Sequence, residues 1–147
     1  MQIADIVQAA DFWAGRSWRK SPLIRTNISS GYPFEDAYGY ARAVRVGDHV
    51  FVSGTTARPP SLDGDVYQQM MGAIATIAAA LAEAGAELRH VVRTVVYIVD
   101  MADAHHVARA HGETFGKTRP ASTLVQVAAL TPASAGVEIE VTAIVHD

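Results

Sequence analysis

The chain has 147 residues, of which 50% are hydrophobic and 18% are charged, and this composition excludes a mainly disordered protein. The formal net charge of -3 disfavours binding to nucleic acid, which depends on lysine and arginine side chains. Cysteine is absent, which excludes disulfide bonds, a thiolate nucleophile and a cysteine-bound zinc ion.

The first 24 residues differ in character from the rest. Helically spaced apolar residues up to Ala10 predict a short helix that Gly15 would end, and a basic connector follows. We interpret residues 1–24 as an N-terminal extension and residues 25–147 as a single domain. No secretory signal is visible, and the longest uncharged run, Gly72–Ala82, is shorter than the about 20 residues of a membrane-spanning helix. We therefore expect a soluble, cytoplasmic protein that binds no membrane.

The domain begins with strands. A short edge strand is possible near Asn27. The segments Arg42–Val46 and His49–Ser53 are separated by the two-residue link Gly47–Asp48, and this arrangement predicts a β-hairpin.

The clearest helix covers Val66–Ala84. Asp65 and Gln68 have the spacing of a capping box at its start, and Gly85 is suited to the left-handed conformation that ends a helix. One apolar stripe recurs at helical spacing: Met70, Ile74, Ile77 and Leu81.

The second half of the chain predicts a strand, a helix and two more strands. Val91–Val99 is apolar on both alternating faces, which is typical of a strand covered on both sides. Asp103 can cap a second helix that ends near Phe115. Its expected inner side consists of Ala104, Val107, Ala108 and His111. Strands are expected at Ser122–Ala128 and Val137–His146.

The predicted order is β-β-α-β-α-β-β, perhaps with one strand before it, and the fold class is α+β. Right-handed crossovers place both helices on one face of the sheet. The other face then has no helix to cover it, so we expect another copy of the chain to pack there.

Two glutamates on the last strand are candidates for chemistry. Alternation places Glu138 and Glu140 on the same face, opposite an aliphatic face. They are either solvated or, if another subunit covers this face, partly buried, and then one could act as a general base toward water. Arg119 and Ser122 flank the turn into the neighbouring strand. Arg119 is either a surface residue or a guanidinium that recognises a carboxylate.

No metal or cofactor motif is present in the sequence. The spacings among His105, His106 and His111 never give the i, i+4 pair of a helical metal site. Phosphate-cradling and zinc-protease motifs are absent, and Ser53–Gly54 lacks the flanking glycine of the serine-hydrolase turn. We expect neither a metal nor another cofactor.

Segments of the chain, taken together and in order, resemble the Rid family, also called the YjgF family, of reactive-intermediate deaminases. The resemblance covers residues 26–147. The matching stretches are Tyr40–Gly54, Ala84–Ala86, Val91–Tyr97, Asp100–Asp103, Phe115, Arg119–Ser122 and Val137–Glu140.

The resemblance implies a chorismate-mutase-like α+β fold and a homotrimer with small-molecule pockets between subunits. In active members, water adds to an enamine or imine and ammonia leaves. By position, Glu138 orients the water, and Tyr40, Ser53 and Gly54 line the pocket. The family's carboxylate-binding arginine is replaced here by Ser122.

Three functions remain open on this basis. The first is an enzyme, a hydrolase of the deaminase type that uses Glu138. The second is a non-catalytic trimer that binds a metabolite or has a regulatory role. The third, endoribonuclease activity, is disfavoured by the net charge. Because Ser122 cannot replace a guanidinium, and Ala108 stands where the family often has asparagine, we expect little turnover of 2-aminoacrylate. Arg119 would reach the pocket only from its rim.

Overall fold

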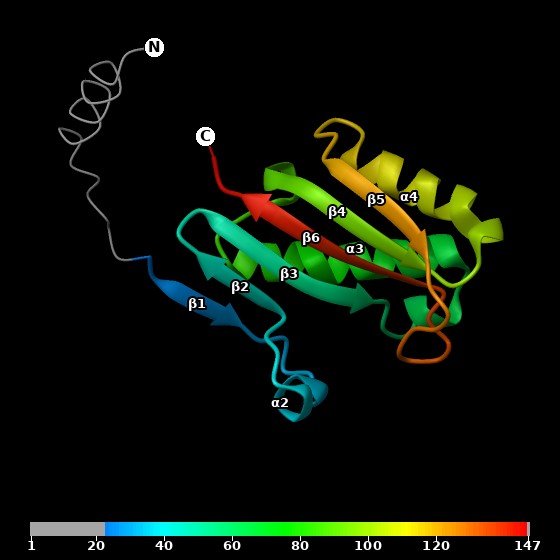
Figure 1. Cartoon of the computed structure of the whole chain (residues 1–147), viewed down its shortest axis with the longest axis horizontal. Coiled ribbons are helices and arrows are strands. Elements are labelled where there is room, and N and C mark those ends of the chain that lie inside the picture. Colours follow the sequence, from blue (N-terminus) through cyan, green and yellow to red (C-terminus); the bar gives the residue numbers. More distant parts are fainter. Residues whose placement is uncertain (1–22, 147) are drawn as a thin grey trace, which may run out of the picture.

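Residues 23–146 are described by a computed structural model (Figure 1). Most of the extension predicted for residues 1–24 therefore lies outside the described residues. The strands are β1 (Arg25–Ile28), β2 (Ala43–Val46), β3 (His49–Thr56), β4 (Val91–Ile98), β5 (Ala121–Gln126) and β6 (Val137–Ile144). The α-helices are α2 (Phe34–Tyr38), α3 (Val66–Glu83) and α4 (Ala104–Phe115), and short 3-10 turns lie at Ser61–Asp63, Leu88–His90 and Met101–Asp103. The α+β class is confirmed, and α2 is an element that the sequence pattern did not predict.

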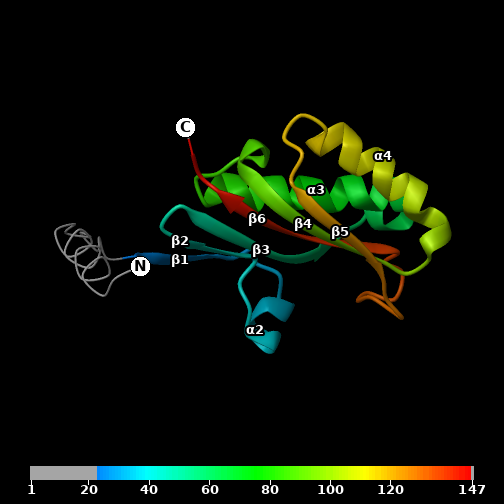
Figure 2. The ribbon, with the colours of Figure 1, turned by 45° about the horizontal axis from the view of Figure 1, so that its top comes forward.

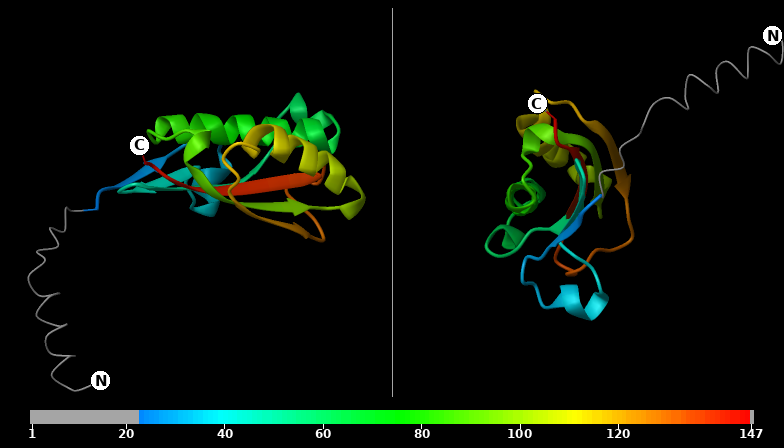
Figure 3. Two further views of the ribbon diagram at one scale, coloured as in Figure 1. Left: turned by 90° about the horizontal axis from the view of Figure 1, so that it is seen from above. Right: turned by 90° about the vertical axis from the view of Figure 1, so that its left-hand side faces the viewer.

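The six strands form one sheet in the order β1-β2-β3-β6-β4-β5, in which only β4 and β5 are parallel. The predicted hairpin is confirmed, because Val46 pairs with His49 and leaves Gly47 and Asp48 as the turn. Gly47 has a φ of 60°, the positive value that the mirror-image turns of two-residue hairpins require at their first central residue. Both α3 and α4 lie on the same face of the sheet (Figure 3).

Helix α3 forms as its sequence predicts. The Asp65 side chain accepts from the Gln68 amide, and the Gln68 side chain accepts from the Asp65 amide, which completes the capping box. Gly85 follows with a φ of 72°. The predicted apolar stripe is fully buried against the sheet: Met70, Ile74, Ile77 and Leu81.

Helix α4 differs from its prediction in two details. The Asp103 side chain does not cap it, because Asp103 itself ends a 3-10 turn and lacks the extended backbone of a capping residue. Asp100 instead accepts from the Ala102 amide at the start of that turn. The buried side consists of Val107, Ala110 and Phe115, whereas Ala108 is exposed. The buried side of the helix differs from the predicted one because α4 packs beside α3 (Figure 2).

The two faces of the sheet differ sharply. Along β6, the residues toward the helices are buried, whereas Glu138, Glu140, Thr142 and Ile144 are only partly buried. Neither α3 nor α4 covers this second face, where Phe51 and Val125 are 49% and 38% exposed. All six residues of the edge strand β5 are exposed. None of the described helices is long and apolar enough to cross a membrane.

Candidate functional site

A pocket of about 690 Å³ lies where β3 ends and β6 begins. Four of the predicted site residues line it: Tyr40, Ser53, Gly54 and Glu138. They come from three parts of the chain that the sheet brings together, namely the approach to β2, the end of β3 and the start of β6 (Figure 1). Its volume is in the range of small-molecule sites.

Glu138 is the half-buried carboxylate of this pocket. It packs directly on the Gly54 backbone, so closely that a Cβ at Gly54 would overlap one carboxylate oxygen and stand 3.0 Å from Cδ. No group among the described residues donates a hydrogen bond to it. Burial above all, together with the charge of Glu140, raises the pKa of Glu138, and the charge of Arg42 opposes this shift. The result is a carboxyl group that takes up a proton at a higher pH than an ordinary glutamate.

Glu140 has a different environment on the same face. The Tyr97 hydroxyl donates to Glu140 at 3.3 Å, and Arg93 Nη1 lies 4.0 Å from the carboxylate. Burial, followed by the charge of Glu140, raises the pKa of Tyr97, so this tyrosine remains a hydrogen-bond donor. Glu140 therefore has local partners, whereas Glu138 has none among residues 23–146.

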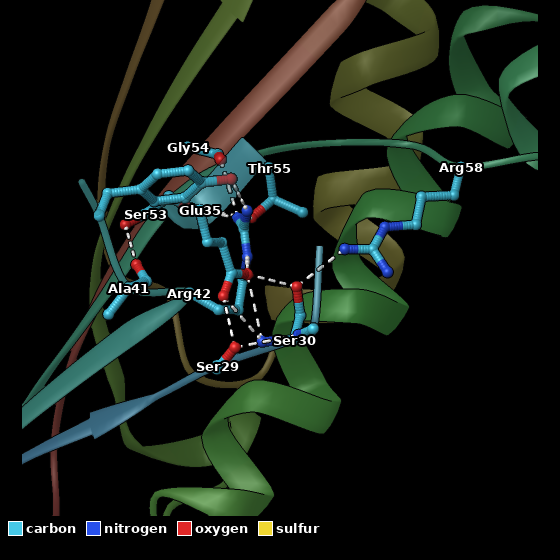
Figure 4. Close-up of polar contacts among 11 residues, drawn as sticks. Ser29, Ser30, Glu35, Ala41, Arg42, Ser53, Gly54, Thr55 and Arg58 are labelled. Atoms are coloured by element: carbon cyan, nitrogen blue, oxygen red, sulfur yellow. Dashed lines mark hydrogen bonds and ion pairs between the residues drawn. The ribbon is translucent and has the colours of Figure 1, made fainter. Parts of the chain in front are cut away.

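A buried arginine, Arg42, forms the floor of the pocket, and Figure 4 shows its polar contacts. A β-bulge inserts one extra residue into β3 between Val52 and Thr55, which frees carbonyl groups from the β-ladder. Arg42 Nη1 donates to the Gly54 carbonyl at 2.9 Å, to Thr55 Oγ1 at 2.7 Å and, at 3.4 Å, to the Ser53 carbonyl. Its Nη2 donates to the Tyr40 hydroxyl at 2.8 Å. Arg42 thus holds Tyr40 and the Ser-Gly pair in place.

The counter-ion of Arg42 is the buried Glu35 of α2, whose carboxylate lies 3.8 Å from Nε. Glu35 also accepts from the Ser29 hydroxyl at 2.7 Å and from the backbone and side chain of Ser30. Burial alone would raise the pKa of Glu35, but the hydrogen bonds from Ser30 and Ser29 and the Arg42 charge lower it overall. Sequence reasoning missed both residues. The available signal was the position of Arg42 directly before β2, next to the buried Ala43.

Aromatic side chains form the outer wall of the pocket. Phe34 and Tyr38 of α2 stack with ring centroids 5.7 Å apart, and Tyr38 meets Tyr40 edge-on at 6.0 Å. Tyr32 lines the same wall, with the Arg58 guanidinium 5.2 Å above its ring. The sequence analysis predicted no element at Phe34 and Tyr38, because this stretch has no periodic pattern.

Ser122 lies elsewhere in the single chain. Ser122 pairs with Thr94 of β4, whereas Glu138 pairs with Tyr97 of the same strand. Thr94 and Tyr97 are three residues apart, which is about 10 Å along β4. The Ser122 side chain is on the helix-covered side, where Thr94 donates to it at 2.8 Å. His111 Nε2 is 2.9 Å from the Thr94 hydroxyl and 3.4 Å from that of Ser122. Burial lowers the pKa of His111, which favours the neutral imidazole.

Arg119 is also outside the Glu138 pocket. It has a φ of 49°, an uncommon left-handed conformation for a residue other than glycine, and lines a separate hollow with Arg89 and His146. Within residues 23–146, no cluster of three histidine, aspartate or glutamate side chains could hold a metal ion.

Fold and site together define an α+β protein whose sheet is covered by helices on one face and carries, where β3 ends and β6 begins, a pocket with one carboxylate and an aromatic wall. A family model described as Endoribonuclease L-PSP matches residues 33–145. A crystal structure of a YjgF-family member from Mycobacterium tuberculosis is 43% identical, with a TM-score of 0.78, and the match covers 83% of this chain and 100% of that chain.

Two curated relatives extend these matches. An uncharacterized protein of Streptomyces coelicolor is 40% identical over 119 residues, which cover 79% of this chain and 89% of the relative. The human 2-iminobutanoate/2-iminopropanoate deaminase is 32% identical over 128 residues, which cover 84% of this chain and 93% of the relative. The chain belongs to the YjgF family, also called the Rid family.

Proposed function

We propose that the protein is a homotrimer that binds a small metabolite in pockets between subunits and adds water to an enamine or imine there, with release of ammonia. The observation that carries this proposal is Glu138, a half-buried carboxylate with a raised pKa and no hydrogen-bond donor among the described residues. The human relative named as a 2-iminobutanoate/2-iminopropanoate deaminase supports the same reaction class.

The reaction needs only proton transfers around the water and the nitrogen. The water oxygen bonds to the imine carbon while Glu138 accepts a proton from it. Glu138 returns this proton to the nitrogen, which gives a carbinolamine. The remaining hydroxyl proton then passes through Glu138 to the nitrogen, the C–N bond breaks, and ammonia leaves as the carbonyl forms. No electrons pass to another molecule, so the step requires no redox cofactor. A carboxyl group whose pKa is raised above the ordinary glutamate value suits these proton transfers.

The trimer is proposed from the uncovered parts of the sheet. Phe51 and Val125 are exposed on the helix-free face, and every residue of the edge strand β5 is exposed. Closure into a ring of three copies would cover this face and protect the strand edge. In such a ring, the exposed strand β5, which contains Ser122, can lie beside the Glu138 pocket of a neighbouring copy. Light scattering at low micromolar concentration should give about three times the chain mass of 15.7 kDa; a stable monomer would contradict the proposal.

A second candidate is a trimer that binds a metabolite without catalysis. The observation that favours it is the absence of a guanidinium at position 122, together with the separate location of Arg119. Ribonuclease activity, the name of the matched family model, has less support, because the net charge of -3 suits a polyanionic ligand poorly.

The deciding experiment measures imine hydrolysis directly. An amino-acid oxidase generates imino acids from a series of L-amino acids, and capture by semicarbazide reports how fast each imine disappears. We expect the native protein to accelerate hydrolysis of at least one imine and Glu138→Gln to abolish the acceleration. Glu140→Gln, on the same face but with its own partners, is the matched control. If no imine reacts faster than in buffer, the binding trimer replaces the enzyme as the conclusion.

A further inference from the structure

Two arginines line the Glu138 pocket, and only one of them has a counter-ion among the described residues. Arg42 is buried, donates to three backbone or side-chain oxygens of β3 and to Tyr40, and has Glu35 as its counter-ion. Its charge and most of its donors are therefore used within the chain. Arg42 stabilises the floor of the pocket and has little capacity to bind a ligand.

Arg58 is the other arginine, and it lies on the loop after β3. Its Nη2 donates to the Ser30 hydroxyl at 2.9 Å, and its guanidinium stacks over the Tyr32 ring. Among the described residues, no carboxylate lies within ion-pair distance of Arg58, and its other N–H groups donate to none of them. The side chain is thus held by two contacts at the pocket that it lines, of which Figure 4 shows the one to Ser30. Its charge and its remaining donors have no partner among the described residues.

The wall beside Arg58 consists of flat aromatic faces. Tyr32, Phe34 and Tyr38 are 48%, 49% and 75% exposed, which is unusual for such large side chains. Phe34 and Tyr38 are nearly parallel, with an interplanar angle of 6°. Aromatic rings stack favourably on other planar groups in offset arrangements, and exposed apolar patches are typical of binding surfaces.

We propose that the Glu138 pocket binds a planar, conjugated carboxylate, whose anionic group pairs with Arg58 and whose body lies on Tyr32, Phe34 and Tyr38. This inference rests on the proposed function for the location of the pocket but not for the addition of water. A guanidinium offers two parallel N–H donors to a carboxylate, and one hydrogen bond to Ser30 leaves enough donors for such a fork. The anion would thus be bound within one subunit, without a cation at position 122.

The test uses trans-cinnamate as the probe and calorimetric titration of the full-length native protein. Cinnamamide has the same planar body without the charge, and 3-cyclohexylpropanoate has the charge without the planar body. We expect native protein to bind cinnamate roughly 10- to 100-fold more tightly than cinnamamide, and more tightly than the saturated acid. Arg58→Gln should remove the preference for the acid over the amide. Arg119→Gln, which removes an exposed arginine outside the pocket, should leave it unchanged.

The outcomes separate the alternatives. Equal binding of cinnamate and cinnamamide to native protein, no binding of either, or a preference that survives Arg58→Gln would overturn the anion site. Tighter binding of the saturated acid than of cinnamate would refute the claim that the ligand is planar. Loss of the preference for the acid only in Arg119→Gln would show that the carboxylate binds in the hollow lined by Arg119 and not at Arg58. The thermal midpoint of Arg58→Gln should equal that of native protein, because its side chain is exposed. If the protein prefers cinnamate but hydrolyses no imine, only the proposed reaction is refuted. If it hydrolyses an imine and Arg58→Gln leaves the KM unchanged, only this inference is refuted.

Discussion

Gly54 has no side chain at the point where the Glu138 carboxylate packs, and replacing it by alanine tests the role of that carboxylate. The new Cβ would stand 3.0 Å from Glu138 Cδ and overlap one oxygen, whereas carbon atoms in contact lie about 3.5–4.0 Å apart. The carboxylate must therefore move by roughly 1 Å. A displacement of about 1 Å at a reacting group can reduce the rate 100-fold.

Stability should change much less than activity. Gly54 is not one of the glycines with a positive φ, so alanine fits its backbone without strain. The clash is with the flexible end of a side chain, which can rotate away. We expect the free energy of unfolding to change by less than about 1 kcal/mol, while imine hydrolysis falls about 100-fold.

The assay compares Gly54→Ala, Glu138→Gln and the double variant, each by imine capture and by thermal unfolding. If Gly54→Ala acts through the carboxylate, it should cost almost nothing further once Glu138 is glutamine, since effects of groups that act as a unit are not additive. Loss of the same factor in both backgrounds, or no loss in the native background, would refute the reasoning.

Replacing Glu35 by glutamine leaves the Arg42 charge buried without its counter-ion, so urea denaturation should show a loss of about 3–5 kcal/mol; a loss below about 1 kcal/mol would show that the pair is dispensable. Glu138→Gln should raise the thermal midpoint at pH 7 but not at pH 3. The raised pKa means that the folded chain is destabilised only once this carboxyl group ionises, as the pH rises above its ordinary pKa; equal shifts at both pH values would contradict this. In titrations with an identified ligand, Glu138→Gln should lose more affinity than Glu140→Gln, and equal losses would reject the assignment. Ser122→Arg should raise turnover of 2-aminoacrylate roughly 10- to 100-fold, and an unchanged rate would show that the missing guanidinium is not what limits it.

The elements that the sequence predicted well are those with local signals. The Gly47–Asp48 turn, the capping box of α3 and the strict alternation of β6 each depend on residues within a few positions of one another. Such patterns specify an element before its partners are known. Helix α2 has no such pattern, because it is only five residues long and is tied down by the contacts of Glu35.

The site was predictable only where the resemblance supplied positions. Tyr40 and Glu138 lie in one pocket because β3 and β6 are neighbours, which the order of elements alone does not reveal. The separate location of Ser122 follows from the parallel register of β5 on β4, a tertiary property. Arg42 and Arg58 look alike in the sequence. Only the structure distinguishes the arginine that has a buried counter-ion from the one that has none within the described part of the chain.

The β-bulge in β3 has a consequence for how ligand preference evolves in this family. The carbonyl groups that it presents to Arg42 belong to the main chain, so no side-chain substitution in the bulge deletes them. The aromatic wall on α2 and the loop with Arg58 consist of side chains on short, exposed segments, where single substitutions change shape and charge freely. Descendants of one ancestor can therefore inherit the same floor while their walls diverge. Within such a lineage, a shared fold and a shared glutamate do not transfer a ligand from one member to the next.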